Sequence, residues 1–150
     1  MNATTSKESA EKPAAQDRVA ERLRAFGLRP TRQRRALAAL LFTGEDRHVT
    51  AEMLHEQAVR AAMPVSLATV YNTLHQFTRA GLLREVAIDG SKSYFDTNTS
   101  DHHHFYVENE NRLIDIEGDS IKVDGLPEAP EGLEIAHIDV VVRVRRTTEP

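Results

Sequence analysis

The chain has 150 residues and a net charge of −4, which allows one or two small domains and excludes a large multi-domain enzyme. It contains no cysteine, so disulfides, thiolate metal sites and thiol nucleophiles are excluded, and any metal must be held by imidazole and carboxylate groups. The sequence has neither a run of about 18 apolar residues nor a signal-like start. A cytoplasmic protein with no membrane partner is therefore expected.

Charge is distributed unevenly along the chain. Residues 17–95 hold 12 Lys and Arg against 8 Asp and Glu, whereas residues 96–150 hold 5 against 13. A basic half joined to an acidic half suggests that the first half meets a polyanion and the second has another task. Residues 1–16 hold no large apolar residue beyond the initiator methionine, and they predict a disordered tail.

Four helices are predicted in the basic half. The first covers about residues 17–26, with Val19, Leu23 and Phe26 on one face. Each of the other three follows a residue suited to an N-cap, namely Thr31, Thr50 and Ser66. The last of them, in "SLATVYNTLHQFTRAGLL", repeats apolar residues at helical spacing and is expected to end at Gly81.

A hairpin is predicted after these helices. In "LLREVAIDGSKSYFD", two alternating runs flank Asp89 and Gly90, a pair favoured by type I′ turns. Helices followed by a hairpin are the order of a winged helix-turn-helix. Residues 17–95 are therefore predicted to form a DNA-binding domain, followed by a hinge at residues 96–99.

The fourth helix has the character of a recognition helix. Its outward residues near the N-terminal end include Tyr71, suited to thymine methyl groups or a phosphate, and Asn72, suited to adenine. Arginines around the second helix suit phosphates or a narrow minor groove. The predicted contacts to double-stranded promoter DNA are Arg29, Arg32, Ser66, Thr69, Tyr71 and Asn72.

The acidic half predicts a small sheet domain. "HHHFYVEN", "NRLIDIEG" and "EIAHIDVVVRVRR" each have strand character, and the last places alternate apolar residues on one face. We interpret residues 100–146 as a small α/β domain, which makes the whole chain α+β. Its apolar face is too large for about fifty residues to cover, which predicts burial in a homodimer.

Several segments resemble one family. "RPTRQRRALAAL", "HVTAEML", "SLATVYNTLHQFTRAGLL" and the histidine-rich segment are similar, in that order, to the ferric uptake regulator family over about residues 17–146. The resemblance implies a winged-helix domain, a dimerisation and sensing domain, and metal sites that gate binding to promoter DNA, which we expect to be AT-rich. Family members usually carry arginine where Asn72 stands, so the base read at that position can differ.

The three adjacent histidines are the main candidate ligands. In a strand, His102 and His104 share one face and His103 lies on the other. The family resemblance implies a regulatory site for Fe, Mn or Zn formed by His48, Asp96, His102, His104 and Asp115. It also implies a second metal or haem site formed by Asp101, His103 and His137, with Lys122 where the family usually has glutamate.

Three histidines without any cysteine resemble the haem-responsive iron response regulator branch of this family. Haem iron accepts neutral imidazole, so His102, His103 and His104 are also candidate haem ligands. The resulting hypothesis is a non-enzymatic repressor controlled by haem, a divalent metal or both. Two alternatives stay open at this point: a metalloenzyme that activates water, for which no separate general base is visible, and a haem or metal carrier without a DNA role.

Overall fold

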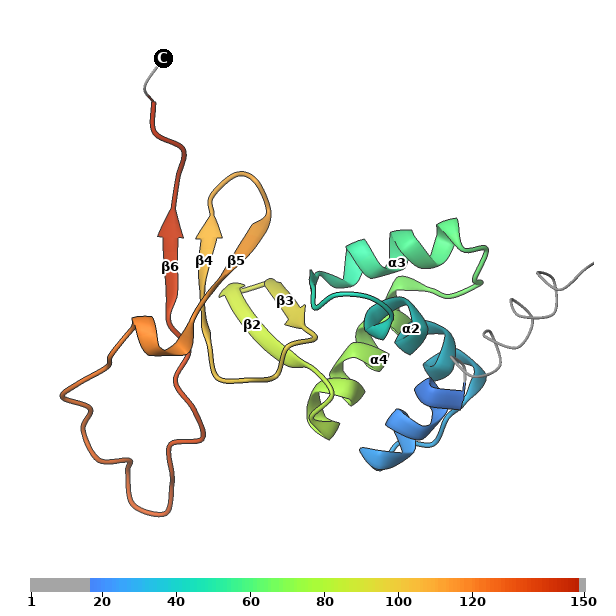
Figure 1. Ribbon diagram of the computed structural model, residues 1–150, viewed down its shortest axis with the longest axis horizontal. Coiled ribbons are helices and arrows are strands. Elements are labelled where there is room, and N and C mark those ends of the chain that lie inside the picture. Colours follow the sequence, from blue (N-terminus) through green and yellow to red (C-terminus); the bar gives the residue numbers. More distant parts are fainter. Residues whose placement is uncertain (1–16, 149–150) are drawn as a thin grey trace, which may run out of the picture. The chain divides into compact units, whose positions relative to one another are not determined.

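The computed structural model describes residues 17–148, so the tail predicted at residues 1–16 lies outside the described residues. The chain divides into two compact units, the first ending at Thr99 and the second beginning at Ser100 (Figure 1). Helices and two separate small sheets confirm the α+β class. Within residues 17–148, no helix combines the length and apolar character that crossing a bilayer requires.

The first unit begins with four helices. Residues 17–25 are helical and are followed by α2 (Arg32–Phe42), α3 (Ala51–Arg60) and α4 (Leu67–Ala80). All three predicted N-caps are confirmed, because each side-chain oxygen accepts a hydrogen bond from the backbone N–H three residues later. Gly81 ends α4 with a φ of 92°, a left-handed conformation that glycine adopts without strain.

One apolar core holds this unit together. Leu37, Leu54, Leu74 and Phe77 have no exposed surface, and they come from α2, α3 and α4. Phe26 was predicted on the buried face of the first helix, but 43% of it is exposed. The helix ends at residue 25, so Phe26 lies in the following turn and its side chain no longer follows the helical repeat.

A three-stranded sheet completes the first unit. Strands β1 (His48–Val49), β2 (Arg84–Asp89) and β3 (Lys92–Asp96) lie in the order β1-β3-β2, and both pairs are antiparallel. The predicted hairpin is β2–β3, but its turn is not type I′. Asp89 pairs with Lys92, and neither Asp89 nor Gly90 has the positive φ that a type I′ turn requires.

The second unit is a smaller sheet. Strands β4 (His103–Val107), β5 (Arg112–Ile116) and β6 (Val141–Val144) lie in the order β5-β4-β6, with β4 antiparallel to β5 and parallel to β6. The third predicted strand is therefore much shorter than its alternating sequence. Among the described residues of this unit, the only helical element is the 3-10 turn η1 (Gly118–Ser120).

Candidate functional site

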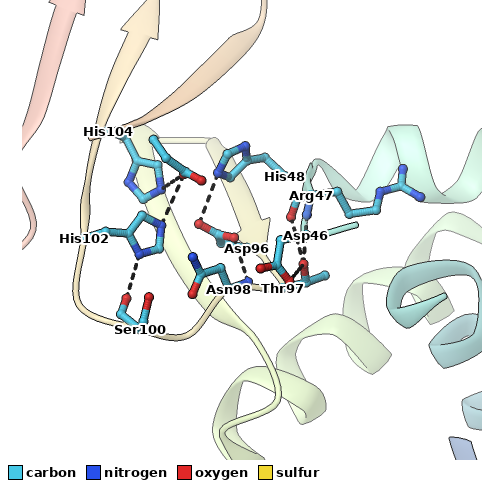
Figure 2. Close-up of polar contacts among 10 residues, drawn as sticks. Asp46, Arg47, His48, Asp96, Thr97, Asn98, Ser100, His102 and His104 are labelled. Atoms are coloured by element: carbon cyan, nitrogen blue, oxygen red, sulfur yellow. Dashed lines mark hydrogen bonds and ion pairs between the residues drawn. The ribbon is translucent and has the colours of Figure 1, made fainter. Parts of the chain in front are cut away.

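In the first unit, a histidine and an aspartate meet across two strands. The register of β1 and β3 pairs His48 with Asp96, and His48 Nε2 lies 3.1 Å from Asp96 Oδ2. The second carboxylate oxygen of Asp96 accepts the backbone N–H of Asn98 at 2.9 Å (Figure 2). Asp96 is buried, with 1% of its surface exposed. A buried carboxylate beside an imidazole is a pair of donors suited to a divalent cation.

The backbone beyond this pair keeps it in place. Thr97 N–H donates to the Arg47 carbonyl at 3.1 Å, and the Thr97 hydroxyl oxygen accepts the Arg47 backbone N–H at 2.9 Å. The Arg47 guanidinium donates to the Leu40 carbonyl in α2 at 3.2 Å, and burial lowers the pKa of Arg47. The two-residue strand β1 is therefore anchored to both β3 and α2.

In the second unit, two histidines share one carboxylate. Asp115 lies opposite His104 in the β4–β5 register, and its Oδ1 is 3.4 Å from His104 Nε2 and 3.3 Å from His102 Nε2. The two rings are close, with centroids 4.5 Å apart (Figure 2). Two imidazoles and a carboxylate form a three-donor set within this unit alone, and both histidines are buried.

Hydrogen bonds assign opposite roles to His102 and His103. His102 Nδ1 lies 2.7 Å from the Ser100 carbonyl, which can only accept, so Nδ1 carries a proton and Nε2 is the nitrogen that faces Asp115. A backbone carbonyl on the far nitrogen is the usual outer partner of a metal-binding histidine. His103 Nδ1 instead accepts the Val140 backbone N–H at 3.1 Å, so its neutral ring carries the proton on Nε2.

The candidate DNA face lies on α4 and around α2. Asn72 is exposed, and Thr69 and Tyr71 are half-buried. The Ser66 hydroxyl caps the helix by accepting from Thr69 N–H at 3.1 Å, and it also donates to Thr69 Oγ1 at 2.9 Å. Ser66 thus has a local structural role whether or not it touches DNA. Arg32 is exposed.

The side chain of Arg34 is held by hydrogen bonds within the protein, whereas the side chain of Arg29 is exposed. The Arg34 guanidinium donates twice to Gln76 Oε1 in α4, at 3.1 and 3.3 Å, and once to the Arg29 carbonyl at 3.0 Å. Arg34 therefore ties α2 to α4, while the side chain of Arg29 is exposed. Sequence patterns do not separate these roles, because both arginines belong to one basic run.

Comparison with known proteins decides the family. A profile of the ferric uptake regulator family matches residues 25–143. This chain belongs to the ferric uptake regulator family. It is therefore a transcriptional regulator and not an enzyme, and family members bind DNA as dimers.

Within the ferric uptake regulator family, named relatives include peroxide regulators. The peroxide operon regulator of Bacillus subtilis (strain 168) is 34% identical over 119 residues, which cover 78% of this chain and 81% of the relative. The peroxide-responsive repressor PerR of Staphylococcus aureus (strain Mu50) is 35% identical over 96 residues, and the chain spans 64% of its length and 63% of its own. The predicted haem-responsive branch gains no support from these relatives.

A solved structure of the same family has a similar fold. The ferric uptake regulator of Pseudomonas aeruginosa, solved with manganese, matches with a TM-score of 0.64 and 28% identity, covering 84% of this chain and 96% of the other. The family match therefore extends over both units of the chain.

The family's second site is not assembled here. The described residues of the second unit do not bring Asp101, His103 and His137 together as a metal-ligating group. His137 Nε2 instead lies 2.9 Å from Asp139 Oδ2, and His103 is bonded to the backbone of Val140. Lys122 is exposed and offers a cation where a carboxylate ligand would be needed. This second site stays a prediction without structural support within one chain.

Two further histidines, His55 and His75, contact residues of other elements within the first unit. His55 on α3 donates from Nε2 to the Val65 carbonyl at 3.0 Å, which ties α3 to the residue before the α4 N-cap. His75 on α4 is exposed, yet its ring packs edge-on against Phe95 of β3 with centroids 5.6 Å apart. The spacing within each helix gives no signal for either contact, because both partners come from other elements.

Proposed function

We propose that this chain is a dimeric repressor of promoter DNA whose affinity depends on one divalent metal ion, with Fe, Mn or Zn as candidates. The proposed ligands are His48, Asp96, His102, His104 and Asp115. The first two belong to one unit and the last three to the other, and the family resemblance assigns all five to a single regulatory site.

The observation that carries this proposal is the close grouping of His102, His104 and Asp115. His102 donates from Nδ1 to the Ser100 carbonyl, so its Nε2 is directed at a carboxylate oxygen of Asp115 3.3 Å away. A neutral imidazole nitrogen and a carboxylate oxygen at that separation need a cation between them, which is either a proton on Nε2 or a metal ion. A divalent metal ion supplies that cation, and the nearby Nε2 of His104 adds a further ligand.

The remaining donors suit the same ion. The three ligands of the second unit alone would leave coordination positions for water, whereas His48 and Asp96 add an imidazole and a carboxylate. An ion bound by both sets would restrict the motion of the DNA-binding unit against the dimerisation unit. Such an ion favours DNA binding only through its higher affinity for the arrangement that fits two half-sites.

The reading face of α4 supports an AT-rich operator. Tyr71 can contact thymine methyl groups, and Asn72 can form a bidentate pair with adenine. Arg29 and Arg32 are exposed and suit phosphates or a narrow minor groove.

Haem is the weaker candidate ligand. The rings of His102 and His104 have centroids 4.5 Å apart, and both Nε2 atoms lie within 3.4 Å of Asp115 Oδ1, which leaves little room for a macrocycle beside either nitrogen. His103 would have to give up its hydrogen bond from Val140 and change tautomer before it could ligate iron. The haem-responsive branch would therefore need a rearrangement of the β4 histidines.

A response to peroxide is a second candidate function. It is favoured by the identity of 34 to 35% to the two peroxide regulators named above. Because the chain has no cysteine, such a response would not use a thiol. It is tested by adding hydrogen peroxide to the metal-loaded protein on DNA and following its release.

A single titration tests the metal proposal. Duplexes selected from a randomised pool by the full-length protein with Mn²⁺ are labelled, and binding is followed by anisotropy in Mn²⁺, in Zn²⁺, in haem and in chelator. We expect either metal ion to strengthen binding, haem to have no comparable effect, and His104→Leu to remove the metal dependence. Tight binding in chelator, unchanged by any addition, would contradict the proposal.

A further inference from the structure

We propose that Glu52 is a positioning residue for DNA reading, which holds Tyr71 so that the ring edge and not the hydroxyl meets the DNA. Glu52 lies in the first turn of α3, and Tyr71 lies on α4. This inference rests on the proposed role of α4 in reading bases, and it adds a residue from a different helix to that role.

The Tyr71 side chain is held at both ends. Its hydroxyl donates to Glu52 Oε1 at 2.7 Å. Its ring is stacked against His75 one helical turn later, with centroids 6.3 Å apart and planes 20° from parallel. His75 in turn packs edge-on against Phe95 of β3. A ring fixed in this way loses little side-chain freedom when it meets a base, which favours binding.

The hydrogen bond also decides which part of Tyr71 is offered to DNA. A phenol has one O–H, and here Glu52 accepts it, so the hydroxyl cannot donate to a phosphate without breaking that bond. The Glu52 carboxylate would also repel a phosphate placed beside the hydroxyl. What remains for the DNA is the apolar ring edge, which suits the methyl group of thymine in the major groove.

The ionisation of Tyr71 agrees with this geometry. The hydrogen bond to Glu52 raises the pKa of Tyr71, and a smaller contribution comes from burial. The phenol therefore stays protonated throughout the neutral range and keeps its bond to the carboxylate. Glu52 also has a merely structural role open to it, because an acidic residue in the first turn stabilises a helix N-terminus.

The experiment measures how strongly full-length variants distinguish thymine from uracil, which lacks the methyl group. Each thymine of the selected duplex is replaced in turn by deoxyuridine, and Tyr71→Ala identifies the position that Tyr71 reads. At that position we expect the wild-type protein to lose about fourfold in affinity per half-site, the effect of one methyl group withdrawn from contact. Glu52→Gln keeps a hydrogen-bond acceptor without the charge and should keep this discrimination.

Glu52→Ala and Tyr71→Phe should both reduce the discrimination to less than about twofold, because each keeps the aromatic ring but removes the hydrogen bond that positions it. Loss of the charge or of helix stabilisation would lower the DNA affinity of Glu52→Gln and Glu52→Ala alike. Neither effect would change the ratio of affinities for thymine and uracil. If the position identified by Tyr71→Ala were read equally well by Glu52→Ala, the role of Glu52 would be overturned while α4 remained the reading helix. If no thymine responded to Tyr71→Ala, both this inference and the proposed thymine contact of Tyr71 would be wrong, while the proposed adenine contact of Asn72 on α4 would be unaffected.

Discussion

Replacing His102 or His103 with leucine, one at a time, should produce two different defects. His102 directs its Nε2 at the carboxylate of Asp115, whereas His103 accepts the backbone N–H of Val140. His102→Leu removes a proposed metal ligand, and His103→Leu removes only a hydrogen-bond acceptor. The two variants carry the same substitution one residue apart, so each is the matched control of the other.

The magnitudes follow from these contacts. Loss of outer-shell partners of a metal costs about 10- to 100-fold in affinity, so loss of a direct ligand in His102→Leu should cost at least about 10-fold. His103→Leu leaves the Val140 N–H without its acceptor, which costs about 1–3 kcal/mol for a buried group. Because His103 and Val140 are only half-buried, water can reach them, and we expect the lower end, about 1 kcal/mol.

Two assays separate the defects. Mn²⁺ affinity is measured by competition with an indicator, and the local stability of β6 is measured by hydrogen exchange of the Val140 amide in metal-free protein. Because 1.4 kcal/mol corresponds to about tenfold, a loss of about 1 kcal/mol in His103→Leu should make this amide exchange about fivefold faster. The same variant should bind Mn²⁺ nearly as the parent does. The reasoning is refuted if His103→Leu weakens Mn²⁺ binding as much as His102→Leu.

Three further predictions concern other parts of the chain. Ser66→Ala should destabilise the first unit by about 1 kcal/mol, the usual cost of a lost N-cap, as measured by urea unfolding; no change would show that the cap contributes nothing to α4. Arg32→Ala should reduce the slope of log affinity against log salt by about one unit, because one phosphate contact is lost; an unchanged slope would remove Arg32 from the interface. Glu110 is paired with Arg146, whose hydrogen bonds lower the pKa of Glu110 below its ordinary 4.5. The stabilisation from this pair should therefore be present at neutral pH and lost as pH falls through the lowered pKa, so that Arg146→Gln and the parent converge in acid; a difference that persists once Glu110 is protonated would contradict this.

Local chemistry made the helices of the first unit predictable. Thr31, Thr50 and Ser66 are residues whose side chains cap the helix that follows, and the structure has each helix starting directly after them. The strand β1 gave no such signal, since its two residues are too few to alternate. It forms because Asp96 and Phe95 of β3 offer a partner edge to His48 and Val49, 48 and 46 residues later in the chain.

The second unit was less predictable for a related reason. Alternation between Glu134 and Arg146 indicates which residues share a face, but a strand also needs a neighbour to accept its hydrogen bonds. β4 provides one only over Val141–Val144, where the parallel ladder forms. The Asp89-Gly90 turn failed differently, because the register of β2 and β3 shifts between Ala87 and Asp89 and moves the turn one residue along.

For the candidate site, sequence supplied the residue types but not the roles of the individual nitrogens. Strand alternation separates His103 from His102 and His104. Only the structure shows that His102 donates from Nδ1 to the Ser100 carbonyl and that His103 Nδ1 accepts the backbone N–H of Val140. Both contacts are made by backbone groups, which every residue carries, so the sequence does not indicate which of these groups will bond to a histidine.

The most direct test of the central claim is the Mn²⁺ dependence of DNA binding in Asp96→Asn. This substitution keeps an oxygen that can accept from Asn98 N–H and removes only the negative charge beside His48. If one ion is shared by His48, Asp96 and the three ligands of the second unit, the variant should need at least about 10-fold more Mn²⁺ to reach half-maximal DNA binding. A variant that responds to Mn²⁺ at the same concentration as the parent would show that the second unit holds the ion without Asp96, and the shared site would be wrong.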